Sequence, residues 1–303
     1  MNRLKFLIIV IAINGFATFS CVSVNNLMES SFETPKFEAQ ITVSDVVEKA
    51  EEIEEVEKID FSPFLSTALI NAQLPQKMSV IIQENITANP AFINELFIIL
   101  QTDPYLWMLV DREHSLNEDY EPHDLIELKD NSYRVHREEI FLRSAAVEAL
   151  EEMSAAAKND GLTLMASSGY RPYVHQLEVF ARNVRELGQR TAARRTAQPG
   201  HSQHQLGLAV DFGSMTYAFA RTAQSRWLIA NASRFGWSMS YPQGYENVTG
   251  YSYECWHYRY VGKELAQLID NYFDGIQHYA LKFFNELKNN EELIAYARAS
   301  LTK

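Results

Sequence analysis

The chain has 303 residues, of which 47% are hydrophobic and 12% are aromatic. This length and composition predict a globular protein with one sizeable core and exclude a chain that is disordered throughout. The formal net charge is -12, and no run of basic residues follows a predicted element, so nucleic-acid binding is not expected. The only two cysteines are Cys21 and Cys255, which excludes a disulfide framework.

The N-terminus has the layout of a secretory signal peptide. Two basic residues precede an apolar run over 6–13, and this run is too short to span a membrane well, so we expect export followed by cleavage. Ser20 before Cys21 resembles a bacterial lipoprotein processing signal, in which the cysteine is lipidated and becomes the new N-terminus. The sequence therefore predicts an exported cell-envelope protein with membrane attachment through a lipidated Cys21; plain secretion and an uncleaved anchor are the alternatives.

Composition then changes twice before the main domain. Residues 22–60 are polar and acidic, which is typical of a solvated tether. Apolar clusters interrupted by prolines follow, and they predict short helices packed on the main domain. The predicted boundaries are a signal peptide with the candidate lipoprotein cysteine at 1–21, an acidic tether at 22–60, a helical extension at 61–105, a main domain at 106–275 and a C-terminal helix at 276–303.

The main domain should alternate helices and strands. Residues 136–158 are alanine-rich and amphipathic, which predicts a helix, and 162–166 have the length of a buried strand. A helix is expected after Pro172, with a loop over 191–199. The apolar face of that helix consists of Val174, Leu177, Phe180, Val184 and Leu187. The remaining predicted elements are a helix over 217–235, strands over 237–240 and 253–261, a helix over 263–273 and a helical tail over 279–299.

This order of elements predicts an α+β fold. We expect helices on one face of a small, mainly antiparallel sheet, a zinc cleft on the other face, and an N-terminal helical extension.

The segment 199–213 carries the candidate metal ligands. It places His204 and Asp211 at the two ends of a stretch rich in small residues, and nitrogen and oxygen donors of this kind suit zinc. Alternation along the strand 208–212 sends Asp211 to the face opposite the apolar residues. Because a catalytic zinc usually has three protein ligands, a third is needed, and His257 downstream is the candidate.

With two neutral imidazoles and one carboxylate as ligands, a zinc centre would keep a net positive charge, which can lower the pKa of a bound water towards about 7. Glu254 lies three residues before His257, a spacing that puts the two side chains on opposite faces of a regular strand. A turn or bulge must therefore intervene if both face the metal. In that geometry Glu254 would take a proton from the water and pass it to the leaving amine.

Other metal-binding side chains compete with this assignment. Cys255 is an alternative zinc ligand, although cysteine is also an ordinary small buried residue. We expect His175 to pack on a helix surface and His201 to make a loop hydrogen bond. The remaining histidines have no evident partner and are expected to be structural: His114, His123, His136 and His278.

The pattern Ser-x-His-x-x-Gly-x-Ala-x-Asp over Ser202–Asp211, followed by Glu-x-Trp-His over Glu254–His257, resembles the VanY-type D-alanyl-D-alanine carboxypeptidases, zinc enzymes that trim peptidoglycan stem peptides. The similarity covers roughly 106–268. Further blocks that resemble the family are Ser168–Arg171 with Gln176, Thr249–Tyr251 and His257–Gly262.

The resemblance implies zinc on His204, Asp211 and His257, with Glu254 as the catalytic base. It also implies that Arg171, helped by Ser202 and Gln176, holds the C-terminal carboxylate of the substrate. A guanidinium can bind a carboxylate through two parallel hydrogen bonds, which agrees with this role. Cys255 departs from the family, which often has proline there.

The expected function is that of a zinc-dependent carboxypeptidase, with 106–275 as the catalytic domain, which hydrolyses the C-terminal D-alanine from peptidoglycan stem peptides by metal-activated water. The choice between D,D and L,D cleavage depends on the shape of the pocket and stays open. The alternatives are a peptidoglycan endopeptidase and a non-catalytic wall-binding lipoprotein with a structural zinc site.

Overall fold

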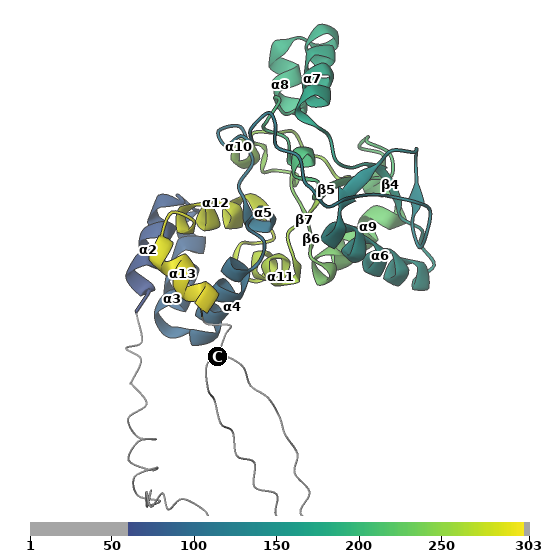
Figure 1. The fold of residues 1–303 in the computed structure, drawn as a ribbon. Coiled ribbons are helices and arrows are strands. Elements are labelled where there is room, and N and C mark those ends of the chain that lie inside the picture. The colour runs from purple at the N-terminus through teal and green to yellow at the C-terminus, as the bar shows by residue number, and fades with distance from the viewer. Residues whose placement is uncertain (1–59, 300–303) are drawn as a thin grey trace, which may run out of the picture. The chain divides into compact units, whose positions relative to one another are not determined.

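The structure is a computed structural model that describes residues 60–299. A sheet part (residues 108–262) and a helical part (60–107 and 263–299) each surround a hydrophobic core (Figure 1). No helix among these residues combines the length and apolar character needed to cross a membrane. The predicted signal peptide, Cys21 and nearly all of the acidic tether lie outside the described residues.

The sheet part is built on a five-stranded sheet in which antiparallel pairing predominates. Its strands, in spatial order, are β2 (Arg134–Val135), β4 (Met165–Ser168), β5 (Ala209–Phe212), β7 (His257–Tyr260) and β6 (Trp237–Met239). Only β2 and β4 run parallel. A separate antiparallel pair is formed by β1 (Leu125–Glu127) and β3 (Phe141–Arg143). The mixture of helices with a small, mainly antiparallel sheet confirms the α+β class.

Helices α6 (Ser144–Asn159) and α9 (Ala223–Asn231) contribute to the core beneath the sheet. The predicted start of the first helix at 136 is wrong, because Phe141–Arg143 form β3 and pair with β1. The predicted helix over 217–235 is also broken into η2 (Phe219–Arg221), α9 and η3 (Ala232–Phe235). Strand β4 begins three residues later than expected.

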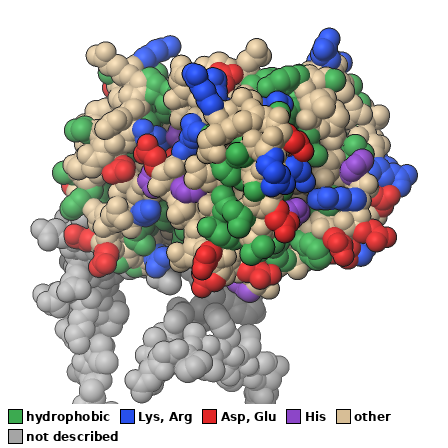
Figure 2. All heavy atoms as spheres, turned by 90° about the horizontal axis from the view of Figure 1, so that it is seen from above, with side chains coloured by type: hydrophobic (Ala, Val, Ile, Leu, Met, Phe, Trp, Pro, Cys, Tyr) green, Lys and Arg blue, Asp and Glu red, His purple; other side chains and the backbone are tan. Residues whose placement is uncertain are grey.

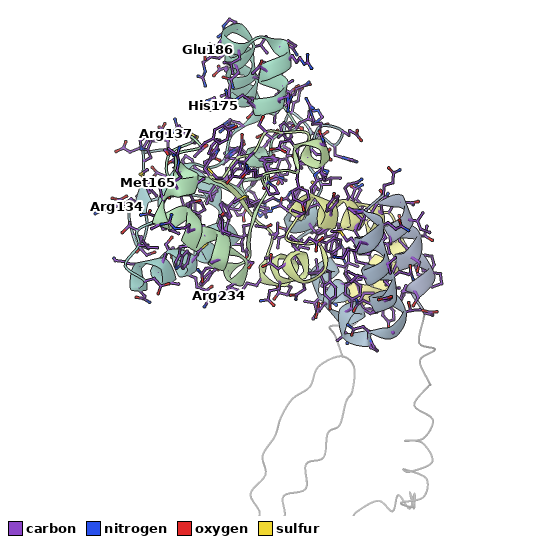
Figure 3. All side chains as sticks on the ribbon, turned by 180° about the vertical axis from the view of Figure 1, so that it is seen from behind. Arg134, Arg137, Met165, His175, Glu186 and Arg234 are labelled. Carbon is purple, nitrogen blue, oxygen red and sulfur yellow. The ribbon has the colours of Figure 1, made fainter. Side chains whose placement is uncertain are left out.

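A helical hairpin stands out from the sheet part at the top of Figure 1. It consists of α7 (Tyr173–Leu187) and α8 (Gln189–Arg195), so the predicted loop over 191–199 is wrong for its first half. Gly188 connects the two helices with a positive φ of 77°, a backbone conformation that other residues rarely adopt. In the view from behind, Glu186 lies near the tip of the hairpin and His175 near its base (Figure 3).

The expected apolar face of α7 does not enter the core. Val174 is 66% exposed and Leu177 is 50% exposed, and Gln176 is the one buried residue of the helix. A periodic apolar stripe normally indicates packing against a core. Here much of the stripe is exposed instead.

The helical part joins the two ends of the described chain. It contains α2 (Ser62–Asn71), α3 (Gln76–Ala88), α4 (Pro90–Gln101) and α5 (Pro104–Trp107), together with α11 (Lys263–Tyr272), α12 (Gln277–Leu287) and α13 (Glu291–Ala299). Helix α12 packs against α2 and α13 against α4 (Figure 1). The segments predicted separately as an extension at 61–105 and a C-terminal helix at 276–303 thus share one core, and their boundaries stay predictions.

Candidate metal centre and substrate cleft

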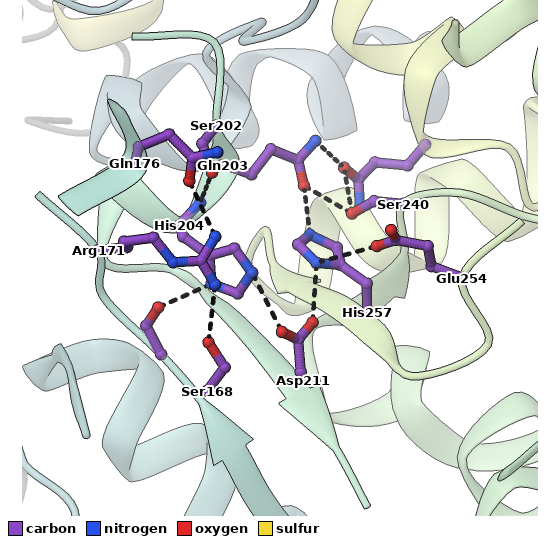
Figure 4. Close-up of polar contacts among 12 residues, drawn as sticks. Ser168, Arg171, Gln176, Ser202, Gln203, His204, Asp211, Ser240, Glu254 and His257 are labelled. Carbon is purple, nitrogen blue, oxygen red and sulfur yellow. Dashed lines mark hydrogen bonds and ion pairs between the residues drawn. The ribbon is translucent and has the colours of Figure 1, made fainter. Parts of the chain in front are cut away.

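Three candidate ligands meet at the centre of the sheet. The β5–β7 register sets Asp211 directly opposite His257. His204 comes from the short helix η1 (Gln203–Leu206), and Gly207 at φ 69° turns the chain from η1 towards β5. Asp211 Oδ2 lies 3.3 Å from His204 Nε2, and its Oδ1 lies 3.0 Å from His257 Nδ1 (Figure 4). The three ligand atoms lie within 4.8 Å of one another.

Hydrogen bonds behind the two imidazoles orient their free nitrogens. His204 Nδ1 lies 2.7 Å from the carbonyl oxygen of Gly169, which can only accept, so Nδ1 carries the proton and Nε2 presents a lone pair. His257 Nε2 lies 3.2 Å from Gln203 Oε1, which assigns the free lone pair to Nδ1. Both lone pairs and the Asp211 carboxylate converge on one point, so the donor set fits a catalytic zinc with three protein ligands.

The electrostatics keep the ligands in the protonation states that bind a metal. Burial and the charge of Arg171 lower the pKa of His204 to about 4, so this imidazole is neutral at pH 7. Burial alone would raise the pKa of Asp211, but interactions with His204 and His257 outweigh it, and the pKa is lowered. Asp211 therefore stays ionised, and metal binding needs no proton release from these two groups.

Glu254 reaches the same point from a tight turn. The amide of His257 donates to the carbonyl oxygen of Glu254 at 3.3 Å, so the chain turns between the two residues. Such a turn is required if both side chains are to face the metal centre. Glu254 Oε2 lies 3.8 Å from His257 Nδ1, and its side chain is 18% exposed. Burial and the Asp211 carboxylate raise the pKa of Glu254, while Arg171 and Arg195 act against the shift.

The three predicted substrate-binding residues lie together beside the ligands. Arg171 follows β4, and its Nη1 donates to Gln176 Oε1 at 2.9 Å while Nη2 donates to Ser168 Oγ at 3.1 Å. Its backbone amide donates to the carbonyl of His204 at 3.1 Å. Ser202 caps η1 by accepting from the amide of His204. The side chain of Arg171 is thus held in place before any ligand binds.

The three candidate ligands, Glu254 and the three predicted substrate-binding residues line one cleft of about 320 Å³. Val179, Asn183 and Leu187 of α7 form part of its wall, and Leu187 is the one member of the predicted apolar face among them. The rest of the lining consists of Arg195, Thr196, Ala197, Met215, Tyr217, Tyr241, Tyr251, Ser252, Tyr253 and Trp256.

Sequence reasoning missed Gln203, which supports the metal centre. Its Oε1 accepts from Ser240 Oγ at 2.7 Å and faces His257 Nε2, and its Nε2 donates to Gln277 Oε1 at 3.3 Å. The one available signal was a polar residue next to His204. Nothing local in the sequence links Gln203 to Ser240 or Gln277, which lie 37 and 74 residues away.

The competing ligands lie apart from the metal centre. Cys255 is fully buried, with Sγ 3.8 Å from the carbonyl of Thr216, and it is not part of the ligand group. The predicted loop hydrogen bond of His201 is confirmed, since its Nδ1 lies 2.7 Å from the carbonyl oxygen of Asp111.

Two of the other histidines have a partner that the sequence did not reveal. His114 Nδ1 lies 2.8 Å from Asp111 Oδ1, and His278 Nε2 lies 3.7 Å from Asp111 Oδ2. His175 is exposed on α7.

A His-Asp-His group with a neighbouring carboxylate and a guanidinium, set in an α+β domain, defines the class of candidate metallopeptidases. The family model of VanY, D-alanyl-D-alanine carboxypeptidase, matches residues 139–263. The chain belongs to this VanY family.

Two curated relatives and one solved structure support the assignment. YodJ of Bacillus subtilis (strain 168), named as a candidate carboxypeptidase, is 38% identical over 179 residues, which are 57% of this chain and 66% of that protein. A D-alanyl-D-alanine carboxypeptidase of Enterococcus faecalis (strain ATCC 700802 / V583) is 35% identical over 56% of this chain and 64% of that protein. The chain thus spans slightly less than two thirds of these relatives.

The structure of the LdcB LD-carboxypeptidase, described as revealing the molecular basis of peptidoglycan recognition, is 37% identical. It matches with a TM-score of 0.53 over 59% of this chain and 85% of that one.

Proposed function

We propose that this protein is a zinc-dependent carboxypeptidase that removes the C-terminal D-alanine from peptidoglycan stem peptides. One observation carries the proposal: the metal-ligand group, the carboxyl of Glu254 and the guanidinium of Arg171 line the same cleft. A structural metal site has no need for the last two groups. Membership of the VanY family and the similarity to D,D- and L,D-carboxypeptidases support the choice of substrate.

Arg171 accounts for the restriction to a terminal residue. Hydrogen bonds to Gln176 and Ser168 fix its guanidinium, so little side-chain entropy is lost when it binds a carboxylate. The free C-terminus of the substrate would bind here, with Gln176 and Ser202 beside it. The last peptide bond would then lie over the ligand group, and a bond farther inside the peptide would not.

Zinc on His204, Asp211 and His257 would polarise the scissile carbonyl and lower the pKa of a water molecule. Glu254 would accept a proton from the attacking water and donate it to the nitrogen of the departing D-alanine. The raised pKa of this carboxyl suits the first step, because its carboxylate takes up a proton more readily than that of an ordinary glutamate. Such a group typically contributes about 10²–10⁴-fold in rate.

The site of action follows from the substrate. Peptidoglycan lies outside the cytoplasmic membrane, so we propose an exported protein, anchored through a lipidated Cys21, with the acidic tether between the anchor and the catalytic domain. Mass spectrometry of the mature protein tests this anchor. A diacylglycerol adduct on Cys21 supports it, and an unmodified N-terminus contradicts it.

The activity is tested by incubating zinc-loaded residues 22–303 with two muropeptides, one ending in D-Ala-D-Ala and one tetrapeptide ending in a single D-Ala. Released D-alanine is followed by mass. Release from either peptide establishes the carboxypeptidase and selects D,D or L,D specificity. Release from neither, with zinc bound, refutes the proposal in favour of a wall-binding protein, and cleavage of an internal bond refutes it in favour of an endopeptidase.

A further inference from the structure

The substrate cleft contains a second arginine that the proposed chemistry does not use. Among the residues that line the cleft, Arg171 and Arg195 are the only cations, and Asp211 and Glu254 are the only carboxylates. Arg171 is held by Gln176 and Ser168. The side chain of Arg195, by contrast, makes no hydrogen bond or ion pair with any residue between 60 and 299, and it is exposed to solvent.

The backbone around Arg195 is fixed although the side chain is free. The amide of Ser252 donates to the carbonyl of Arg194 at 2.8 Å, which ties the end of α8 to the loop before Glu254. Gln176 Nε2 donates to the carbonyl of Ala197 at 2.7 Å, and Asn183 Nδ2 donates to Thr196 Oγ1. The Cα of Arg195 is therefore held at the edge of the cleft, while its guanidinium is available to a ligand.

Arg195 lines the same cleft as Arg171 and Glu254. Arg171 and Glu254 lie on opposite sides of the ligand group (Figure 4), and the Ser252 bond ties the residue before Arg195 to the loop that leads to Glu254. A peptide whose C-terminal carboxylate binds Arg171 would extend its acyl portion across the ligand group towards Glu254, whose loop is tied to the end of α8 next to Arg195.

The local charge favours an anion. The hairpin over 173–195 contains five arginines and two glutamates, whereas the whole chain carries a net charge of -12. The face seen from above carries basic side chains across most of its extent, with acidic ones more frequent towards one edge (Figure 2). Apart from Asp211 and Glu254, the cleft lining has no carboxylate that could pair with a free ammonium group of a substrate.

We propose that Arg195 binds a second carboxylate of the substrate, located on the acyl side of the scissile bond. The inference rests on the proposed carboxypeptidase function and narrows its substrate class to stem peptides that carry such a carboxylate. Two positions can supply it: the side chain of a diamino diacid residue, or the α-carboxylate of a glutamate linked through its γ-carboxyl. A guanidinium binds either in the same way.

Binding measurements with three peptides that end in D-alanine separate these sources. The first has both carboxylates, the second has lysine in place of the diamino diacid, and the third has the glutamate α-carboxylate amidated. Isothermal titration uses zinc-loaded protein with the substitution Glu254→Ala, so that no peptide is consumed. Arg195→Ala is then added, and Arg190→Ala serves as the matched control, since Arg190 is exposed on the same helix and does not line the cleft.

We expect Arg195→Ala to weaken binding of the first peptide about five- to tenfold, as for a partly solvated charge pair. The affinity for one of the other two peptides should stay unchanged, because that peptide lacks the carboxylate that Arg195 binds. That peptide identifies the source of the carboxylate. The effect should shrink in 1 M salt, and Arg190→Ala should change binding less than twofold. An equal loss with all three peptides, no loss, or no preference of the parent protein for the first peptide overturns the inference.

The two proposals fail in different ways. If the parent protein with Glu254 intact releases D-alanine but Arg195→Ala leaves all three affinities unchanged, the carboxypeptidase stands and the role of Arg195 is wrong. If no peptide is cleaved, the function is wrong, whatever the binding data show.

Discussion

Replacing Gly169 by alanine should weaken metal binding without touching a metal ligand. A Cβ at position 169 would lie 2.5 Å from the carbonyl oxygen of Phe141 and 2.8 Å from Ile140 Cγ2, about 1 Å closer than the ~3.5 Å at which such atoms normally rest. Phe141 belongs to β3, whose backbone cannot move as a flexible side chain would. The chain at Gly169 must therefore shift, and it carries the carbonyl oxygen that holds His204 Nδ1 at 2.7 Å.

The losses of stability and of metal affinity can both be estimated. Overpacking of this kind typically costs about 1–3 kcal/mol of stability, and loss of the group that orients a metal-bound histidine typically lowers metal affinity about 10–100-fold. We expect Gly169→Ala to show both effects. Urea unfolding gives the free energy of unfolding, and competition with a chelator of known affinity gives the zinc affinity of the folded protein.

Gly161→Ala is the matched control for a loss of stability alone. Gly161 has φ 77°, and a Cβ added at this position would have no neighbour within 4 Å, so alanine there should cost about 1–2 kcal/mol through backbone strain. It lies at the end of α6 and touches no ligand. If Gly169→Ala lost stability like this control but kept its zinc affinity within about threefold, the carbonyl of Gly169 would not orient His204 in the way we argue.

Three further predictions concern catalysis, specificity and pH. Glu254→Ala should retain zinc, measured by atomic absorption, and lose about 10²–10⁴-fold in turnover; an unchanged rate would refute its role as the base. Arg171→Ala should reduce kcat/KM for peptides with a free C-terminus much more than for the same peptides amidated, and unchanged discrimination would contradict the carboxylate clamp. Asp124 is hydrogen-bonded to Arg143 Nε at 2.8 Å and to Ser144 Oγ at 3.0 Å, which lowers its pKa although burial opposes the shift. Because the pKa of Asp124 is lower in the folded protein, its stabilisation is fully present above the unfolded pKa of about 3.9 and is lost as the pH falls through the folded pKa. In urea unfolding, the wild type should therefore lose stability more steeply than Asp124→Asn below about pH 4. Parallel curves of stability against pH would refute the argument.

The central strands and the candidate ligands could be predicted because their signals are local. The alternation around Asp211 and the short motif before it place one ligand on a buried strand and another just ahead of it. The spacing of Glu254 and His257 required a turn, and the turn is present. These inferences depend on a few neighbouring residues, whose geometry the backbone largely dictates.

The sequence-based predictions are wrong where tertiary contacts determine the local structure. The apolar stripe of α7 has helical periodicity, but periodicity cannot distinguish a face that packs on a core from one that stays exposed. The residues before α6 were assigned to the helix, yet they pair as β3 with a strand some 16 residues earlier. Gln203 and Arg195 gain their importance from contacts with distant segments, and no local pattern marks such residues.

The helical part lies largely outside the matched family region, yet two polar connections tie it to the strand that carries His257. Arg259, two residues along β7, is fully buried, and its Nη2 donates to the carbonyls of Tyr105 at 2.8 Å and Leu106 at 3.1 Å in the helical part, and to that of Met108 just beyond it at 2.9 Å. Gln277, at the start of α12, accepts from Gln203, which in turn faces His257 Nε2.

Buried polar groups are costly unless they are paired, so removal of the helices would leave the guanidinium of Arg259 and the side chain of Gln203 without these partners. The helical part therefore does more than cover apolar surface. It supplies hydrogen-bond partners to Arg259 and Gln203 beneath the metal centre, and this gives a physical reason why one fold contains both parts.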